Sequence, residues 1–260
     1  MALKPNPSLF RRIALGAVLP IVLLALWQIL SFQGFFRPTL LPSPLTIAQT
    51  AWDLLQTGEL EKNLAISLWR VLQGFALGAT AGLLVGLALG LSDRLRQLSR
   101  GLTEFLRPIP TIAWVPILIL WMGIDEGSKI TVIAIGSFWP VFLNTLQGVR
   151  QTDDEYLEVA KVLEKSKWVL VTQVILPSAL PSIFTGLRIG MGIAWASVVG
   201  AELIAASSGI GFMILYAREV SQPDVVLVGV AAIGLTGLII DSLIQKFENI
   251  LLKWNQPHGQ

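Results

Sequence analysis

Long apolar runs alternate with short polar intervals along almost the whole chain. An α-helix needs about 20 apolar residues to cross a bilayer, and most of these runs reach that length. We therefore predict six membrane spans, at residues 13–31, 66–91, 102–123, 129–149, 182–205 and 223–244. The expected fold class is an all-α membrane protein, with residues 1–260 forming a single transmembrane domain.

The first apolar run follows Lys4, Arg11 and Arg12, a pattern that a signal peptide shares. The run is too long for a signal-peptide core, and no small-x-small cleavage site follows it. We interpret it as the first span, with the N-terminus inside.

Local signals predict details between and within the spans. Ser43 is a candidate N-cap and Pro44 a candidate first residue of a short helix on the outer membrane surface, which Gly58 can end. Pro108, Pro110 and Pro116 predict kinks or a broken start in the third span.

Glycines recur at every fourth position in the second span, at Gly74, Gly78, Gly82, Gly86 and Gly90. This spacing places bare backbone along one helix face, where a neighbouring helix can approach closely. We interpret it as helix packing. Arg70 is expected near the outer end of this span, where its side chain can snorkel to the interface.

The longest polar interval is the loop at 150–181. Its first part has helical spacing, because Tyr156, Val159, Ala160 and Leu163 fall on one face. Asp153 to Glu155 suit the start of such a helix, and Lys165 and Lys167 suit its end. An amphipathic helix within a loop predicts a surface against which it docks.

Composition agrees with the hydrophobic pattern. The chain is 53% hydrophobic and 14% charged, with a mean hydropathy of +0.68, whereas soluble domains average about 25% charged residues. It has no cysteine, which excludes disulfides and thiolate metal sites, and its one histidine is His258 near the C-terminus. We expect neither catalytic residues nor a metal site.

The distribution of basic residues predicts the orientation. Thirteen lie on the proposed inner side and four on the outer side, as the positive-inside rule requires, so both termini and loop 150–181 are expected in the cytoplasm. The inner set is Lys4, Arg11, Arg12, Arg94, Arg96, Arg100, Arg107, Arg150, Lys161, Lys165, Lys167, Lys246 and Lys253, and the outer set is Arg37, Lys62, Lys129 and Arg218.

Residues 158–177, EVAKVLEKSKWVLVTQVILP, resemble the EAA motif of ABC importer permeases, E-A-A-x3-G-x9-I-x-L-P. Glu158 takes the Glu position, Val159 and Ala160 the two Ala positions and Val174 the Ile position, while Leu176 and Pro177 match. The Gly position holds Glu164. Since glycine permits a bend, we expect the first helix to run further here and the turn to fall elsewhere.

The resemblance extends over about residues 40–254, through PSPLTIAQTAW, LAISLWRVLQGF, LRPIPTIAWVPILILWMGIDEGSKI, ILPSALPSIFTGLRIG and AELIAASSGIGFMI. These segments resemble the nitrate/sulfonate/bicarbonate (taurine) branch of the ABC importer permeases. The resemblance implies the type I importer permease fold and a multi-pass protein of the bacterial inner membrane, surrounded by lipid. It implies no nucleic-acid partner.

The same resemblance implies the partners. Two copies of the permease would form the pore as a homodimer, two cytoplasmic ATPase subunits would each receive a loop helix in a groove, and a periplasmic or lipid-anchored binding protein would deliver the cargo. The implied ATPase-coupling residues are Glu158, Val159, Ala160, Leu163, Glu164, Leu176 and Pro177. The alternative is a solvated helix without a partner.

The chain has no G-x-x-x-x-G-K-[ST] sequence, so the P-loop route to ATP binding is closed to it. We expect no enzyme activity and no cofactor in this chain, with ATP and Mg²⁺ bound by the partner ATPase. Gly190 and Gly192 lie inside an apolar span rather than after a strand, which does not favour a dinucleotide site.

Polar residues within the spans are candidates for the translocation path: Asn144, Gln147, Arg188, Trp195, Ser197 and Glu202. Arg188 and Glu202 are fourteen residues apart, so they share a helix face near opposite ends. Arg188 could serve an anion path, with a structural pair or interfacial snorkelling as the alternative. Trp195 and Trp114 could gate the pore, although each candidate taken alone is more often a packing residue than a pathway residue.

The predicted function is the permease subunit of an ATP-driven, binding-protein-dependent importer of aliphatic sulfonates such as taurine. Nitrate, bicarbonate or another small anion is the alternative cargo. An ATP-independent secondary transporter or a membrane scaffold is the alternative from another class, because neither needs a docking helix in a cytoplasmic loop.

Overall fold

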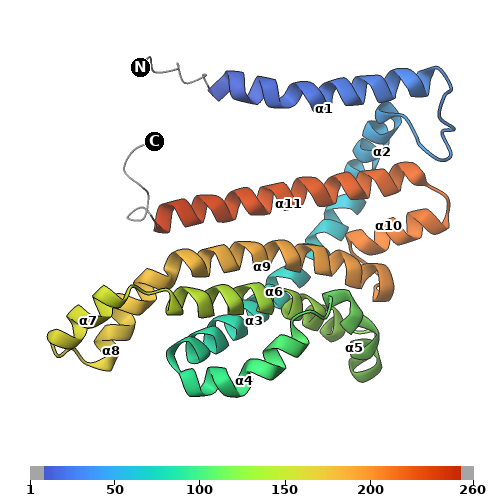
Figure 1. Cartoon of the computed structure of the whole chain (residues 1–260). Helices are drawn as coiled ribbons and strands as arrows, with labels where there is room; N and C mark the ends of the chain where they lie inside the picture. The colour runs from blue at the N-terminus through green and yellow to red at the C-terminus, as the bar shows by residue number, and fades with distance from the viewer. Residues whose placement is uncertain (1–8, 253–260) are drawn as a thin grey trace, which may run out of the picture. The chain divides into compact units, whose positions relative to one another are not determined.

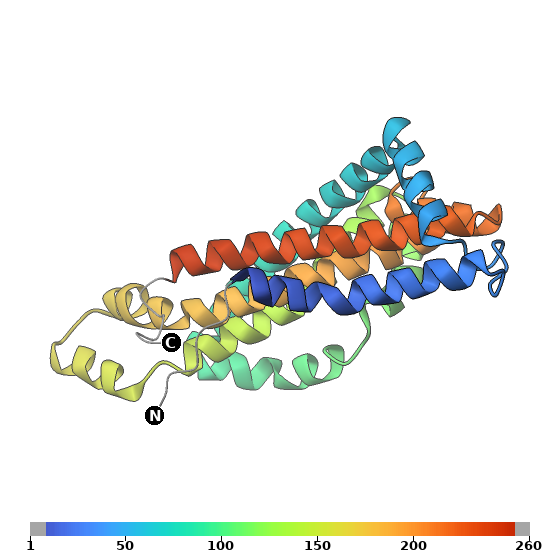
Figure 2. The same cartoon turned by 90° about the horizontal axis from the view of Figure 1, so that it is seen from above.

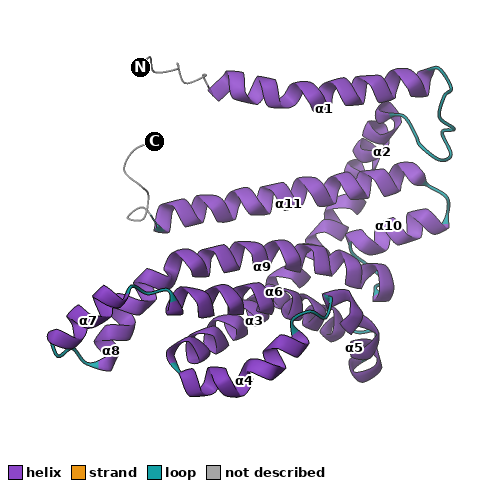
Figure 3. Cartoon of the chain, viewed as in Figure 1, coloured by secondary structure: helices purple, strands orange, loops and turns teal. Residues whose placement is uncertain are grey.

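The computed structural model describes residues 9–252, which are helical wherever they form regular structure (Figure 3). In chain order (Figure 1) the elements are α1 (Leu9–Phe32), α2 (Pro44–Gln56), α3 (Glu59–Leu91), α4 (Asp93–Leu106), the 3₁₀ turn η1 (Thr111–Trp114), α5 (Val115–Met122), α6 (Glu126–Arg150), α7 (Asp154–Val162), α8 (Lys167–Leu170), the π turn η2 (Val171–Ile175), α9 (Leu176–Ala205), α10 (Ile210–Glu219) and α11 (Pro223–Leu251).

The chain forms two compact units. One comprises residues up to 61 together with 213–231, and the other comprises 62–212 together with the chain from 232 onward. The second unit contains the candidate site residues named above.

In the first unit, α2 begins and ends as its sequence predicts. The Ser43 hydroxyl accepts a hydrogen bond from the Thr46 amide at 3.2 Å, and Pro44 is the first helical residue. Gly58 follows the helix with φ +72°, the left-handed conformation that glycine adopts without a steric cost. The Thr50 hydroxyl of α2 donates to the Asp224 carboxylate at the start of α11, at 2.7 Å.

The core of the second unit is formed where α3 packs on α6. The glycine ridge of α3 lies against α6, as its spacing predicts: a methyl group added at Gly86 would lie 2.7 Å from Thr145 Cβ, and one at Gly90 would lie 2.7 Å from Val149 Cγ1. Gly74 meets α6 near its start and Gly90 near its end, so α3 and α6 run in the same direction.

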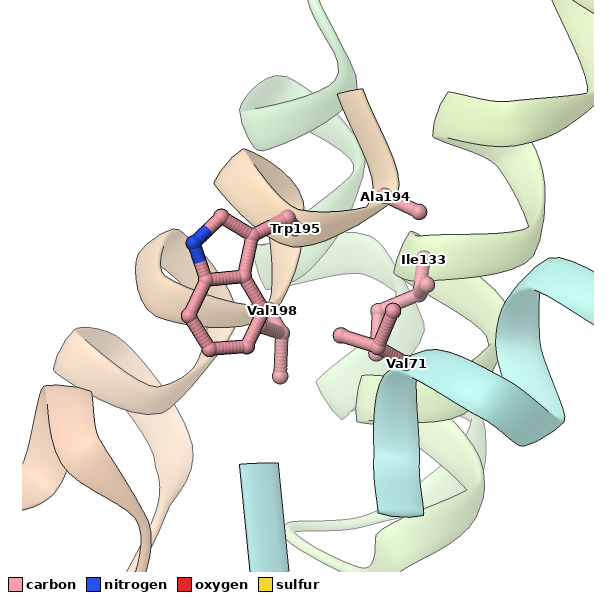
Figure 4. Packing of buried hydrophobic residues seen from close by; sticks show 5 residues of the cluster. All are labelled: Val71, Ile133, Ala194, Trp195 and Val198. Atoms are coloured by element: carbon pink, nitrogen blue, oxygen red, sulfur yellow. The ribbon is translucent and has the colours of Figure 1, made fainter. Parts of the chain in front are cut away.

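Helix α9 packs on α6 in the opposite direction. Gly136 faces Ser197, and Gly148 near the end of α6 faces Ser182 near the start of α9. Between the three helices lies a buried apolar cluster of Val71, Ile133, Ala194, Trp195 and Val198, contributed by α3, α6 and α9 (Figure 4).

The third apolar run is broken, as its prolines predict. The helix pair α4 and η1–α5 bends by 88° across residues 107–110 (Figure 3). α4 begins at Asp93, well before the predicted residue 102, because Ser92 caps it by accepting a hydrogen bond from the Leu95 amide. Residues 93–101, expected as loop, are therefore helical.

The parallel packing of α3 and α6 shows what the broken segment does. α3 ends beside the end of α6, and the chain must return to the start of α6 within residues 92–125. The pair α4–α5 therefore traverses the length of the bundle. This path agrees with the third predicted span, which stays a prediction.

Four helices in the described part of the chain are long and apolar enough to cross a membrane, and the bent pair makes five. The apolar part of α1, Gly16–Phe32, is shorter. The count of six spans, their limits and the cytoplasmic location of both termini stay predictions. Residues 1–8 and 253–260, which include Lys4, Lys253 and His258, lie outside the described residues.

Candidate functional site

The loop that resembles the EAA motif lies beyond one end of the α6–α9 pair, as α7, α8 and η2 (Figures 1 and 2). On α7, Ala160 is buried, whereas Tyr156 and Val159 are exposed at 60% and 56%, and Leu163 just after the helix is exposed at 59%. The predicted helix is present. Most of its apolar face is open to whatever docks there.

An open cleft of about 690 Å³ separates α7 from the returning chain. The four residues of the predicted apolar face all line it, together with Val169, Leu170, Val174 and Pro177 from the other side. The loop is therefore an apolar-walled hairpin, and the common face that the spacing predicts is confirmed.

The expectation that Glu164 lengthens the first helix is wrong. α7 ends at Val162, and Glu164 itself adopts the left-handed conformation, with φ +50°. The Lys165 amide then donates to the Ala160 carbonyl at 3.1 Å, the six-to-one bond of a Schellman cap. The turn stays where the family has glycine, because the cap supplies hydrogen bonds that offset a steric cost of about 1–2 kcal/mol.

The second half of the loop is continuous with the bundle. Ser166 caps α8 by accepting a hydrogen bond from the Val169 amide at 3.3 Å, and η2 runs directly into α9, where Leu176 and Pro177 are the first two residues. Ile175 and Ala179 are buried with Val149 of α6. Leu176 and Pro177 therefore move with α9, while Glu158 is exposed on α7 and makes no ion pair among the described residues.

Three of the residues predicted for a translocation path have packing contacts in the structure. Trp195 belongs to the buried cluster, and its indole N–H donates to the Ile233 carbonyl at 3.1 Å. The buried Ser197 faces Gly136, and the Asn144 amide donates to the Pro140 carbonyl of its own helix at 2.9 Å. Gln147 is exposed.

Arg188 is committed to a partner that the sequence reading missed. Its Nε and Nη2 donate to the two carboxylate oxygens of Asp241 in α11, at 2.6 and 2.7 Å. This bidentate pair favours the structural role over the anion path. Asp241 is the only charged residue in 225–244, and a lone carboxylate in an apolar run is itself a signal for a buried or paired partner.

Glu202 pairs with Arg70 rather than with Arg188. Glu202 is fully buried, and its carboxylate accepts hydrogen bonds from Arg70 Nη1 at 2.8 Å and from the Ser67 hydroxyl at 2.7 Å. Arg70 also donates to both carboxylate oxygens of Glu126, at 2.6 and 2.7 Å. The expectation that Arg70 snorkels to the interface is wrong, because its side chain is buried and pairs with the buried Glu202 and the exposed Glu126.

Side chains beside Arg70 also cap the start of α10. The amides of Gly209, Ile210 and Gly211 donate to the side chains of Asn63, Ser67 and Glu202, each at 2.9 Å. Negative charge at a helix N-terminus is favourable. Gly209 has φ +109° and a methyl group there would collide with Glu202, so only glycine allows this approach. We refer to Ser67, Arg70, Glu126 and Glu202 as the Arg70 cluster.

The loop and the Arg70 cluster lie at opposite ends of α6, which is about 37 Å long with its 25 residues. Glu126 is the first residue of α6, and α7 begins just after its last, Arg150. The structure thus brings Glu202 and Arg70 together at one end of α6 and the α7 residues together at the other end. The α3–α6–α9 core connects the two ends.

Comparisons with known proteins agree with this architecture. Residues 78–251 match the family "Binding-protein-dependent transport system inner membrane component". The "Putative aliphatic sulfonates transport permease protein SsuC" of Bacillus subtilis (strain 168) is 42% identical over 243 residues, which are 94% of this chain and 88% of that protein. The "Bicarbonate transport system permease protein CmpB" of Synechococcus elongatus is 36% identical over 254 residues, covering 92% of this chain and 90% of that protein.

A solved structure shares the fold. The chain matches the crystal structure of an amino acid ABC transporter with histidines at a TM-score of 0.64 and 16% identity, over 75% of this chain and 95% of that one. The fold is that of the type I importer permeases. The chain therefore belongs to the family of binding-protein-dependent transport system inner membrane components, the inner-membrane permeases of ABC importers.

Proposed function

We propose that the chain is the permease of an importer of aliphatic sulfonates such as taurine. The observation that carries this proposal is the 42% identity to an aliphatic sulfonate permease over 94% of the chain. The lower identity to a bicarbonate permease, 36%, supports another small anion as the second candidate. A secondary transporter or a scaffold finds no support in the family assignment.

The partner set is part of the proposal. Two copies form the pore, and two ATPase subunits bind ATP and Mg²⁺ and hydrolyse the ATP, since this chain has no P-loop sequence of its own. A binding protein outside the inner membrane delivers the cargo. This chain contributes no cofactor, no metal and no catalytic residue.

The loop of α7 and α8 is the proposed coupling element. Tyr156, Val159 and Leu163 present exposed apolar surface beside the cleft, and exposed apolar surface of this kind marks a protein-binding site. A partner that moves α7 pulls on α9, because Leu176 and Pro177 begin that helix and Ile175 is packed on α6. ATP-driven closure of the ATPases can thus tilt the core as a rigid body and alternate access to the pore.

The cargo is tested through the partner binding protein. Its affinity for taurine, alkanesulfonates, nitrate and bicarbonate is measured by calorimetry. We expect tight binding of at least one sulfonate. Tight binding of nitrate or bicarbonate with no sulfonate binding contradicts the first choice and selects the second candidate.

The coupling element is tested by co-purification with the ATPase subunits in detergent. Glu158→Lys and Val159→Arg alter exposed positions on α7, so the fold of the loop is expected to persist. We expect both to weaken ATPase retention and to lower uptake. Glu61→Lys, a charge reversal at an exposed position outside the loop, serves as the control and is expected to change neither. Normal retention and uptake in both loop variants would exclude the coupling role.

A further inference from the structure

The break between α4 and η1 lies beside Leu143 of α6, inside the predicted span 129–149, where irregular backbone is unusual. The cavity beside it is lined by Arg107 and Pro108 and, on α6, by Leu143. Leu143 precedes Arg150 by seven residues, which places it about 10 Å along α6 from that end. Within a bilayer, non-helical backbone is tolerated where it is buried in protein or lines a water-filled cavity.

Arg107 is the C-cap residue of α4, and it has no carboxylate partner among the described residues. The arginines at 70, 96, 100, 150 and 188 each have one. An unpaired guanidinium at membrane depth is costly against lipid and favours an aqueous path. Arg107 is exposed, as such a position requires. The distribution of basic residues placed Arg107 on the inner side, whereas its position beside Leu143 puts it within the predicted span 129–149.

The cavity has a volume of about 330 Å³ and is lined by Thr103, Glu104, Arg107, Pro108 and Leu143. The Thr103 hydroxyl donates to the Ser99 carbonyl at 2.9 Å, and Glu104 accepts from Arg100 Nε at 2.8 Å. Among the lining side chains, the guanidinium of Arg107 is therefore the charged hydrogen-bond donor that has no ion-pair partner among the described residues. Pro108 and Leu143 supply apolar wall beside it.

We propose that Arg107 contacts the anionic group of the cargo as it crosses, and that the cavity at the break is a transient anion site on the translocation path. The proposal rests on the proposed import of sulfonates. A planar guanidinium can donate two parallel hydrogen bonds to two oxygens of a sulfonate, while Pro108 and Leu143 contact its carbon chain. Arg107 thereby takes the role that was predicted for Arg188. Arg188 itself is paired with Asp241.

Charge removal tests the site in the complete complex, with the two ATPases in proteoliposomes and the loaded binding protein outside. We expect Arg107→Gln to lower sulfonate uptake about 10- to 100-fold, the range that loss of hydrogen bonds to a charged group implies. ATP hydrolysis stimulated by the binding protein stays near the wild-type rate. Arg107→Lys keeps the charge and retains part of the uptake. Wild-type uptake by Arg107→Gln overturns the proposal.

Arg94→Gln is the matched control, because Arg94 is an exposed arginine of the same helix that has no ion-pair partner among the described residues and does not line the cavity. We expect normal uptake from it. An equal loss in Arg94→Gln and Arg107→Gln attributes the effect to the general charge of α4 and contradicts a site at Arg107.

A second measurement uses thiol labelling, and the labelling itself does not depend on which cargo is imported. The chain has no cysteine, so Arg107→Cys introduces the only thiol. We expect cationic trimethylammonioethyl methanethiosulfonate to label it from water and to restore part of the lost uptake. The anionic sulfonatoethyl reagent is expected to label it without restoring uptake. Resistance to both reagents shows that no aqueous path reaches residue 107, which overturns the proposal.

The two proposals fail separately. If the wild-type complex imports bicarbonate or nitrate but no sulfonate, the proposed cargo is wrong, and the uptake measurements on Arg107→Gln and Arg107→Cys are then made with that anion. If the wild-type complex imports sulfonate and Arg107→Gln does so equally well, the cargo stands and the Arg107 site is wrong.

Discussion

Glu164 shows how one residue can occupy a conformation that its chemistry disfavours. Its φ of +50° places it in the left-handed region, where a side chain costs about 1–2 kcal/mol relative to glycine. The Schellman bond from Lys165 to Ala160 holds it there. The turn therefore forms at the position that the motif spacing gives, although Glu164 has a lower preference than glycine for the left-handed conformation.

Replacing Glu164 with glycine should relieve that cost. We expect Glu164→Gly to slow hydrogen–deuterium exchange of the amides at 163–165 by several-fold, since about 1 kcal/mol of added stability corresponds to about a five-fold change. Glu164→Ala is the control, because its Cβ keeps the steric cost. Equal exchange in all three proteins would argue that the left-handed turn is not the rate-determining feature of this loop.

The Arg70 cluster shows that hydrogen bonds and ion pairs can offset the desolvation cost of burying a charged side chain. Arg70 is 3% exposed and donates to Glu126, Glu202 and the Ser208 carbonyl. Burying a charge in this way is tolerated because every one of its hydrogen-bond donors has a partner. Removing a single partner leaves the rest uncompensated.

Glu202→Leu should therefore destabilise the protein by about 3–5 kcal/mol, the usual cost of breaking a buried ion pair. The measurement is thermal unfolding of the purified permease in detergent. Glu104→Gln, which breaks an exposed pair with Arg100, is the control and should cost about 0–1 kcal/mol. A similar change in unfolding temperature for both variants would contradict the buried role.

At the scale of elements, the α3–α6 contact depends on the absence of side chains. Gly74 to Gly90 give α3 a smooth face, and α6 lies so close that added methyl groups would overlap its atoms. The hydrophobic effect contributes little between helices in lipid, so close packing carries the association. The glycine spacing is therefore a structural requirement rather than a motif for ligand binding.

Gly86→Ala tests this requirement. Its methyl group would lie 2.7 Å from Thr145 Cβ, and we expect a loss of about 1–3 kcal/mol from overpacking, measured by thermal unfolding in detergent. Gly192→Ala on α9 is the matched control, since nothing lies within 4 Å of the added methyl group. A neutral Gly86→Ala would mean that α3 can move away from α6 at no cost.

At the scale of the whole molecule, α4–α5 runs from one end of the α3–α6 pair to the other. The crossing follows from the parallel packing of α3 and α6, since the chain has to return between them. The same path places the break and Arg107 part of the way along the α3–α6 pair. The apolar run at 102–123 predicts a span here and its prolines predict the break, whereas the bend of 88° is seen only in the structure.

Thiol labelling in intact cells tests the crossing, because the chain has no cysteine of its own. Ile124→Cys lies after α5 and Gln97→Cys lies within α4, and both positions are exposed. We expect an impermeant maleimide to label Ile124→Cys from outside and to label Gln97→Cys only after permeabilisation. Labelling of both from the same side would show that the segment re-enters.

Much of this protein could be predicted from residue patterns. Apolar runs imply membrane helices, since backbone groups in lipid must be satisfied within the helix. Glycine spacing predicted the α3 face, Ser43 and Gly58 predicted the limits of α2, and the α7 face followed from helical period. These features are local, and local sequence specifies them.

Partner choice among distant charges could not be predicted in the same way. Arg188 with Asp241 and Arg70 with Glu202 are separated by 53 and 132 residues, and only helix packing brings each pair together. The helical class, the α7 face and the glycine contact surface were determined by the sequence itself, because each depends on neighbours within a few turns. Which arginines are paired, and which one is left free at the break, was decided by the tertiary structure, because a buried charge depends on whatever side chain the fold places beside it.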